Sequence, residues 1–142
     1  MDHVVYVDAK AKEMDKLLTG EKTMIIRGAT GRKIPYGRVF AGENLFFINN
    51  NGEGSVKASG IVKNVFHSDK VTEEESIKLI EENQGKLKLT DKEFKRWAGK
   101  RYIVFVEVEG VKSITPIEID KSQYGNMDDW LPVGDIKTVS RI

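Results

Sequence analysis

The run from Gly20 to Arg27 constrains the fold most, because a helix must end and a strand must begin within it. Apolar residues recur at helical spacing just before this run, and Gly20 can take the left-handed conformation that ends a helix. The residues Thr23–Ile26 are β-branched or apolar, and a Gly-Ala-Thr-Gly sequence follows Arg27. We therefore expect a helix over about Lys10–Thr19, followed by a short buried strand with a cation at each end.

The two cations at the ends of this strand are Lys22 and Arg27. Charged side chains are costly to bury without partners, so each one either opens into a cleft or closes an ion pair inside the protein. In a cleft, the Arg27 guanidinium offers a planar fork for phosphate or carboxylate, and the Lys22 ammonium adds a mobile point charge. Because they are five positions apart, we expect them at opposite ends of the strand and on opposite faces. The cleft and the ion pairs both stay open as alternatives.

Short apolar runs separated by turn residues predict the other strands. We expect them at His3–Val7, Asn44–Asn49, Ser55–Phe66, Tyr102–Val108, Val111–Ile119 and Val133–Val139. The sequence Asn50–Gly54 predicts a hairpin turn, Gly60 marks a bulge or a close approach of backbones, and Glu109-Gly110 predicts the turn of a last hairpin. Because helices lie between groups of strands rather than alternating with each strand, we expect an α+β barrel, formed as one domain over residues 1–142.

Two capping boxes predict the start of two further helices. Thr72 with Glu75, and Thr90 with Glu93, each place a hydroxyl at the N-cap and a carboxylate three residues later. In the second helix we expect Trp97 to pack into the core, which leaves the cations of that helix to point outward. These cations are Lys92, Lys95 and Arg96.

The run that begins at Gly20 fits the pattern G-x-K-x-x-x-x-R, with Lys22 and Arg27 at its fixed cationic positions. It resembles the motif of the ASCH family. The likeness continues through the loop Ile34–Gly37, the turn and strand Gly42–Ile48, and the strand end Gly60–Val65, so that roughly residues 12–66 carry it. The resemblance implies a PUA-like mixed β-barrel with a few flanking helices, and most members of the family are presumed to bind RNA.

The composition excludes several classes of site. There is no cysteine, which excludes disulfides, thiolate zinc sites and a cysteine nucleophile, and His3 and His67 alone offer little for a metal site or a Ser-His-Asp triad. No apolar run approaches the length that spans a bilayer, and no basic-then-apolar leader opens the sequence. We expect no metal, no cofactor, no membrane association, a cytoplasmic location and a monomer.

Charge of one sign gathers in separate parts of the chain, although the net charge is only +1. Residues 27–38 and 86–101 are basic, and residues 69–82 between them are acidic. These segments are either solvated surfaces joined by salt bridges or the basic face of a binding protein. The loop of residues 28–37 suits a flexible flap that carries binding groups, and Tyr36 is placed among its cations for base stacking. Trp130 follows two aspartates that would repel phosphate, so we expect it to plug the end of the barrel.

Our leading hypothesis is a module that binds RNA, or a nucleotide-like ligand, in a cleft at the motif. The residues expected to form this site are Gly20, Lys22, Thr23, Arg27, Arg32, Lys33, Tyr36, Arg38, Lys92, Lys95 and Arg96. A third possibility beside binding and catalysis is a protein-interaction domain that uses the acidic helix and the C-terminal tail.

The catalytic alternative is an amidohydrolase or a ribonuclease that acts on a modified nucleoside or on single-stranded RNA. A small hydrolytic subgroup of the ASCH and PUA-like proteins removes the acyl group from N4-acetylcytidine with a Lys, a Thr and a Glu. The resemblance makes Lys22 the lysine, whereas Ile25 stands at the position of the threonine, and Glu82 is our candidate for the glutamate. Without that hydroxyl, the remaining route is a water activated by Glu82 while Lys22 polarises the carbonyl.

Overall fold

The computed structural model describes residues 1–120, 122 and 128–141, and places six strands in one mixed sheet. The strands are β1 (Asp2–Val7), β2 (Met24–Ala29), β3 (Asn44–Asn49), β4 (Ser55–His67), β5 (Tyr102–Glu118) and β6 (Trp130–Gly134). Their order is β2-β5-β4-β3-β1-β6; β1 and β3 run parallel, and the other neighbours are antiparallel. The sheet is a half-barrel with β2 and β6 as its edge strands, and it curves enough for Arg27 on β2 to bond Tyr6 on β1. The predicted α+β class with a mixed sheet is confirmed.

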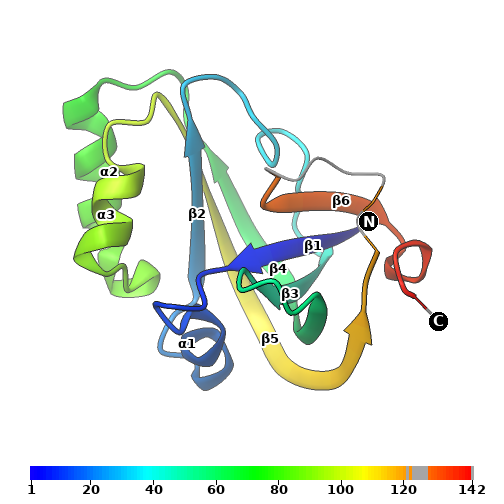
Figure 1. The fold of residues 1–142 in the computed structure, drawn as a ribbon. Coiled ribbons are helices and arrows are strands. Elements are labelled where there is room, and N and C mark those ends of the chain that lie inside the picture. The colour runs from blue at the N-terminus through cyan, green and yellow to red at the C-terminus, as the bar shows by residue number, and fades with distance from the viewer. Residues whose placement is uncertain (121, 123–127, 142) are drawn as a thin grey trace.

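Three α-helices flank the sheet: α1 (Glu13–Thr19), α2 (Glu73–Leu87) and α3 (Asp91–Trp97). In Figure 1, α2 and α3 lie on one side of β2, and α1 lies at the end where β2 begins. None of the described helices has both the length and the apolar composition that crossing a bilayer requires.

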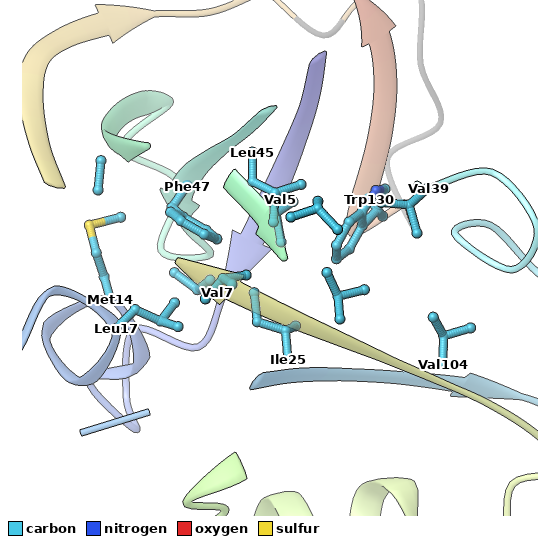
Figure 2. Close-up of a cluster of buried hydrophobic side chains, with 14 residues drawn as sticks. Val5, Val7, Met14, Leu17, Ile25, Val39, Leu45, Phe47, Val104 and Trp130 are labelled. Atoms are coloured by element: carbon cyan, nitrogen blue, oxygen red, sulfur yellow. The ribbon is translucent and has the colours of Figure 1, made fainter. Parts of the chain in front are cut away.

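Strand β2 is buried on both faces, which explains its continuous apolar sequence. Ile25 points into the half-barrel and packs in a cluster with Val5, Phe47 and Trp130 (Figure 2). The alternate residues Met24 and Ile26 pack against the second cluster, which includes Ile80 and Leu87 of α2 and Trp97 of α3. The period of two along the strand therefore joins both layers of the core.

Local signals predicted the helix boundaries well. Both capping boxes are present, with the Thr72 and Thr90 hydroxyls accepting from the backbone N–H groups of Glu75 and Glu93. Gly20 ends α1 with a φ of 79°. The helix is shorter than expected, however, because residues 9–12 form turns before it begins at Glu13.

Gly60 marks both a bulge and a close approach. The pairing of β4 with β5 shifts between Ser59 and Ile61. A Cβ atom at Gly60 would lie 3.1 Å from Val111 and 3.3 Å from Phe47, which is tighter than ordinary van der Waals contact.

The predicted hairpin around Glu109-Gly110 is wrong, because residues 102–118 form the single strand β5, which curves through the lower part of Figure 1. The residues after Gly110 stay paired with β4, as in Ser59 with Lys112 and Ser55 with Glu118. Gly110 takes a φ of 60° and adds one residue to β5 at the register shift, as a bulge does. The last strand also differs from the prediction: β6 is Trp130–Gly134, and a 3₁₀ turn, Ile136–Thr138, follows it.

Candidate functional site

Lys22 lies at the junction of α1, β2 and α2, and it is almost fully buried, with 1 % of its side chain exposed. The chain is fixed on either side of it, because the Lys22 N–H donates to Lys16 and the Thr23 N–H donates to Lys86. Its Nζ donates to the carbonyl oxygen of Leu87 at 2.5 Å and lies 3.4 Å from the Glu13 carboxylate. Of the two alternatives for Lys22, this is the internal ion pair.

The charges around Lys22 are themselves buried. Burial lowers the pKa of Lys22 below its usual value, whereas the carboxylates of Glu13 and Glu93 raise it and Arg27 lowers it further. Glu13 is 6 % exposed and Glu93 is 7 % exposed. Glu93 therefore has two roles: it closes the capping box of α3 and it lies close enough to Lys22 to stabilise the ammonium.

Arg27 lies on β2, and it too is buried, with 7 % of the residue exposed. Its Nη1 donates to its neighbour Ile26 at 2.7 Å, and its Nη2 donates to the carbonyl oxygen of Tyr6 on β1 at 2.6 Å. Since β2 and β1 are not neighbours in the sheet, this second bond spans the open side of the half-barrel. Arg27 thus ties the two sides of the opening together.

The third guanidinium nitrogen of Arg27, Nε, is not used in the same way. Nε lies 3.3 Å from Oδ2 of Asp129, yet it makes no hydrogen bond to any described residue. A buried donor without an acceptor costs about 1–3 kcal/mol. Arg27 therefore retains a hydrogen-bonding capacity that the described residues do not satisfy.

Aromatic rings and a second guanidinium surround Arg27. Its guanidinium lies 5.9 Å from the ring centre of Trp97 and 5.6 Å from that of Trp130, within the range of cation–π attraction. The Arg96 guanidinium lies 4.5 Å from the ring centre of Trp97, and its Nη2 lies 3.7 Å from Oδ2 of Asp129. The same carboxylate oxygen thus serves two guanidinium groups.

A cavity of about 150 Å³ opens beside Arg27, between the end of β2, the following loop and α3. We call it the motif cleft. It is lined by Arg27, Gly28, Ala29, Gly31, Lys33, Ile34, Tyr36, Arg96, Trp97, Lys100, Tyr102, Val104 and Asp129. Its charged lining consists of two arginines and two lysines against the single carboxylate of Asp129, so the cleft suits an anion.

The loop beside the cleft is anchored rather than free, contrary to the flexible flap that we expected. The Tyr36 hydroxyl donates to Ser68 at 2.6 Å, and the Gly37 N–H donates to Nδ1 of His67 at 3.2 Å. The Arg32 guanidinium lies 5.8 Å from the ring centre of Tyr36 and 5.6 Å from that of Tyr102. The wall of the cleft is therefore fixed by contacts with β4 and β5.

The structure divides the predicted site residues into groups. Those that line the cleft are Arg27, Lys33, Tyr36 and Arg96. Lys22 is buried and is not part of the lining, and Gly20 and Thr23 belong to the segment between α1 and β2. Those that are exposed and outside the lining are Arg32, Arg38, Lys92 and Lys95. The expectation that Lys22 and Arg27 lie on opposite faces of one strand does not apply, because Lys22 precedes β2. Arg27 lies near enough to Lys22 to lower the pKa of Lys22.

The candidate catalytic residues are also separated. Glu82 lies on α2 with 58 % of its side chain exposed, and it pairs with Lys78 at 3.9 Å. Ile25 is fully buried in the core. The carboxylates that act on Lys22 are Glu13 and Glu93, and both line a smaller cavity of about 50 Å³ that also touches Arg27.

Sequence reasoning did not include three members of this region in the expected site, namely Glu13, Lys100 and Asp129, and it missed the second role of Glu93. Asp129 was interpreted only as a group that would repel phosphate, and nothing local shows that it meets Arg27, about one hundred residues earlier. Lys100 belongs to the basic block of residues 86–101, and this block was the sequence signal that could have indicated it as a site residue.

The chain has the fold of solved ASCH proteins. It matches the crystal structure of ASCH from Zymomonas mobilis with a TM-score of 0.67 and 13 % identity, covering 91 % of this chain and 85 % of that one. A tyrosine-to-phenylalanine variant and a serine-to-alanine variant of that protein match with TM-scores of 0.66 and 0.67. No protein-family model and no curated protein sequence matches the chain. At this identity the likeness establishes the fold, as the resemblance in sequence implied.

Proposed function

We propose that this chain, which shares the fold of the ASCH proteins, binds single-stranded RNA or a nucleotide-like ligand in the motif cleft. The observation that carries the proposal is the lining of that cleft. Arg27, Lys33, Arg96 and Lys100 line it together with three aromatic rings, against one carboxylate. Guanidinium groups bind phosphate through paired hydrogen bonds, and aromatic rings stack on bases of any sequence.

The size of the cleft favours part of a larger ligand. Its volume of about 150 Å³ is below the range of about 300–1,000 Å³ that is typical of pockets for small-molecule ligands. We infer that one phosphate or one base of the ligand enters the cleft while the rest lies on the surface. The exposed cations Arg32, Arg38, Lys92 and Lys95 would extend the track for its phosphates.

The test is a fluorescence-anisotropy titration of labelled single-stranded and hairpin RNA at low and near-physiological salt. We compare the wild type with Arg96→Ala/Lys100→Ala, which removes two cations of the cleft, and with Lys63→Ala/Lys112→Ala, which removes two exposed cations outside it. Loss of two phosphate contacts should reduce the slope of log affinity against log salt by about 1.4. The proposal fails if the two double variants weaken binding equally, or if the folded wild type binds neither RNA at low salt.

The second candidate function is hydrolysis of an N4-acylated nucleoside or a related amide, and the environment of Lys22 favours it. A lysine with a lowered pKa beside two buried glutamates is a frequent feature of catalytic sites. Because Lys22 is enclosed, we rank this function below binding. The matched variants are Glu93→Gln and Glu82→Gln: turnover that depends on Lys22 and Glu93, and not on Glu82, would support it. Turnover that survives Lys22→Met in a folded protein would exclude Lys22 as catalytic.

A further inference from the structure

We propose that Asp129 is an exchangeable counter-ion of the motif cleft, whose carboxylate the phosphate of a bound ligand displaces from Arg27 and Arg96. The inference rests on the proposed function, since it assumes that a phosphate-bearing ligand enters this cleft. It adds a competing contact, because in the free protein the Asp129 carboxylate occupies the position that the phosphate of the ligand would take.

The position of the carboxylate marks the site. Oδ2 of Asp129 lies 3.3 Å from Nε of Arg27 and 3.7 Å from Nη2 of Arg96. Arg27, Arg96 and Asp129 all line the cleft. An oxyanion in place of this carboxylate would lie between two guanidinium groups, which is the arrangement that binds phosphate most strongly.

Among the described residues, none accepts a hydrogen bond from Nε of Arg27 at this position. Its Nη1 and Nη2 are held by the carbonyl oxygens of Ile26 and Tyr6, whereas Nε makes no hydrogen bond to the described part of the chain. The Asp129 carboxylate therefore neutralises Arg27 without saturating it. A phosphodiester has two non-bridging oxygens, so one can accept from Nε of Arg27 while the other pairs with Arg96.

The exchange needs only side-chain rotation. The main chain at Asp129 is fixed, because its carbonyl oxygen accepts from the Tyr6 N–H at 3.0 Å and the next residue, Trp130, donates its indole N–H to His3 at 3.0 Å. The Asp129 side chain is 29 % exposed and that of Arg96 is 55 % exposed. Both can thus turn toward solvent or ligand while β1 and β6 stay in place.

The contact also explains how a deeply placed arginine is tolerated before a ligand binds. A buried guanidinium is costly without a counter-charge, and Asp129 provides one in the free protein. A ligand must replace this charge to gain access to Arg27. Anionic ligands can do so, whereas a neutral nucleoside gains nothing by displacing the carboxylate.

The experiment compares Asp129→Asn with Asp128→Asn, which removes the same charge from the adjacent exposed residue. Melting temperatures are measured against inorganic phosphate, and affinities against labelled single-stranded RNA. We expect Asp129→Asn to melt at a lower temperature than the wild type without phosphate and to gain more from phosphate. Its affinity for RNA should rise roughly 3- to 5-fold at low salt, as expected for removal of a partly exposed competing ion pair. Asp128→Asn should stay close to the wild type in both measurements.

The outcomes separate this inference from the proposed function. If the wild type binds RNA and Asp129→Asn binds it equally or more weakly, the exchange is refuted while the binding function stands. If neither folded protein binds RNA or phosphate, the proposed function fails and this inference fails with it. Should Asp129→Asn not fold, the wild type still gives an answer. Saturating phosphate must then shift the Nε–H resonance of Arg27 in an NMR titration, and an unmoved resonance overturns the proposal.

Discussion

The two cations of the motif, Lys22 and Arg27, are both buried but have different surroundings. Lys22 and Arg27 are both more than nine-tenths buried, and each pairs with a carboxylate. The Lys22 ammonium is bound by Leu87 and Glu13 inside the protein, whereas Arg27 lines a cleft and its Nε–H has no acceptor among the described residues. Burial and charge alone therefore do not identify a binding residue. An unsatisfied donor beside an open cavity does so better.

The largest expected effect comes from removing the enclosed cation. Lys22→Met leaves Glu13 and Glu93 as buried carboxylates without their partner, so the free energy of unfolding should fall by about 3–5 kcal/mol. Urea unfolding measures it. Adding Glu13→Gln, which retains an acceptor for the Asp8 N–H, should recover part of the loss. A cost below about 1 kcal/mol together with loss of RNA binding would show instead that Lys22 belongs to the ligand site.

The second effect should appear in both stability and binding. Arg27→Lys keeps the charge, but a single ammonium cannot reach both the Ile26 and the Tyr6 carbonyl oxygens. We expect unfolding to become easier by about 1.5–3 kcal/mol and RNA affinity to fall at least roughly 10-fold. Arg32→Lys on the exposed part of the loop is the control, and it should alter neither quantity as much. Unchanged RNA affinity in folded Arg27→Lys would contradict our assignment of the site.

The third prediction compares the two capping boxes. Thr90→Ala removes the N-cap of α3 and should cost about 1 kcal/mol in urea unfolding. Thr72→Ala removes the matching cap of α2, whose Glu75 is exposed and does not act on Lys22. The α3 change should also loosen Glu93 and thereby shift the pKa of Lys22 downward, an effect that NMR of the Lys22 side chain measures. An equal shift of the Lys22 pKa in Thr72→Ala would contradict a specific link between the α3 cap and Lys22.

The smallest effect is a pH dependence that comes from His3 on β1. His3 is fully buried, its Nδ1 accepts from the Trp130 indole and its Nε2 donates to Glu43, so the folded state holds it neutral. Burial lowers the pKa of His3 below 6.5. The unfolded chain therefore binds a proton that the folded chain does not, and stability should decline as the pH falls below 6.5.

The measurement is the urea midpoint between pH 7.5 and pH 5. Burial also lowers the pKa of His67, which contributes a slope of the same sign, so the wild type is compared with His3→Gln and with His67→Asn. The urea midpoint of His3→Gln should depend less steeply on pH than that of the wild type. A profile as steep as that of the wild type would show that His3 does not control this dependence.

The sequence determines those parts of the fold that depend on neighbouring residues. The helix stop at Gly20 and the boxes at Thr72 and Thr90 were predicted because a cap involves only residues a few positions apart. Gly110 was misinterpreted for the same reason, since a positive φ suits a turn as well as a bulge. The neighbouring strand β4 decides between them, and the local sequence does not contain that pairing.

The candidate site was predicted only in part, because it depends on contacts between distant segments. The motif indicated Arg27, and the basic loop indicated Lys33 and Tyr36, all of which line the cleft. Asp129 and Glu13 could not be assigned, because their roles depend on which cation each one meets. The cleft is bordered by β2 and α3, whose separation in the chain hides their proximity.

The most direct test of our central claim is an NMR titration of the protein with a short single-stranded RNA. The two tryptophans are internal reporters, because Trp97 lines the motif cleft and Trp130 is bound to His3 in the core. We predict saturable shifts at the Trp97 indole and at the amides of Gly28 and Gly31, with little change at Thr23 beside Lys22. Shifts concentrated at Thr23, with the Trp97 indole unmoved, would place the ligand at the Lys22 end and contradict the account.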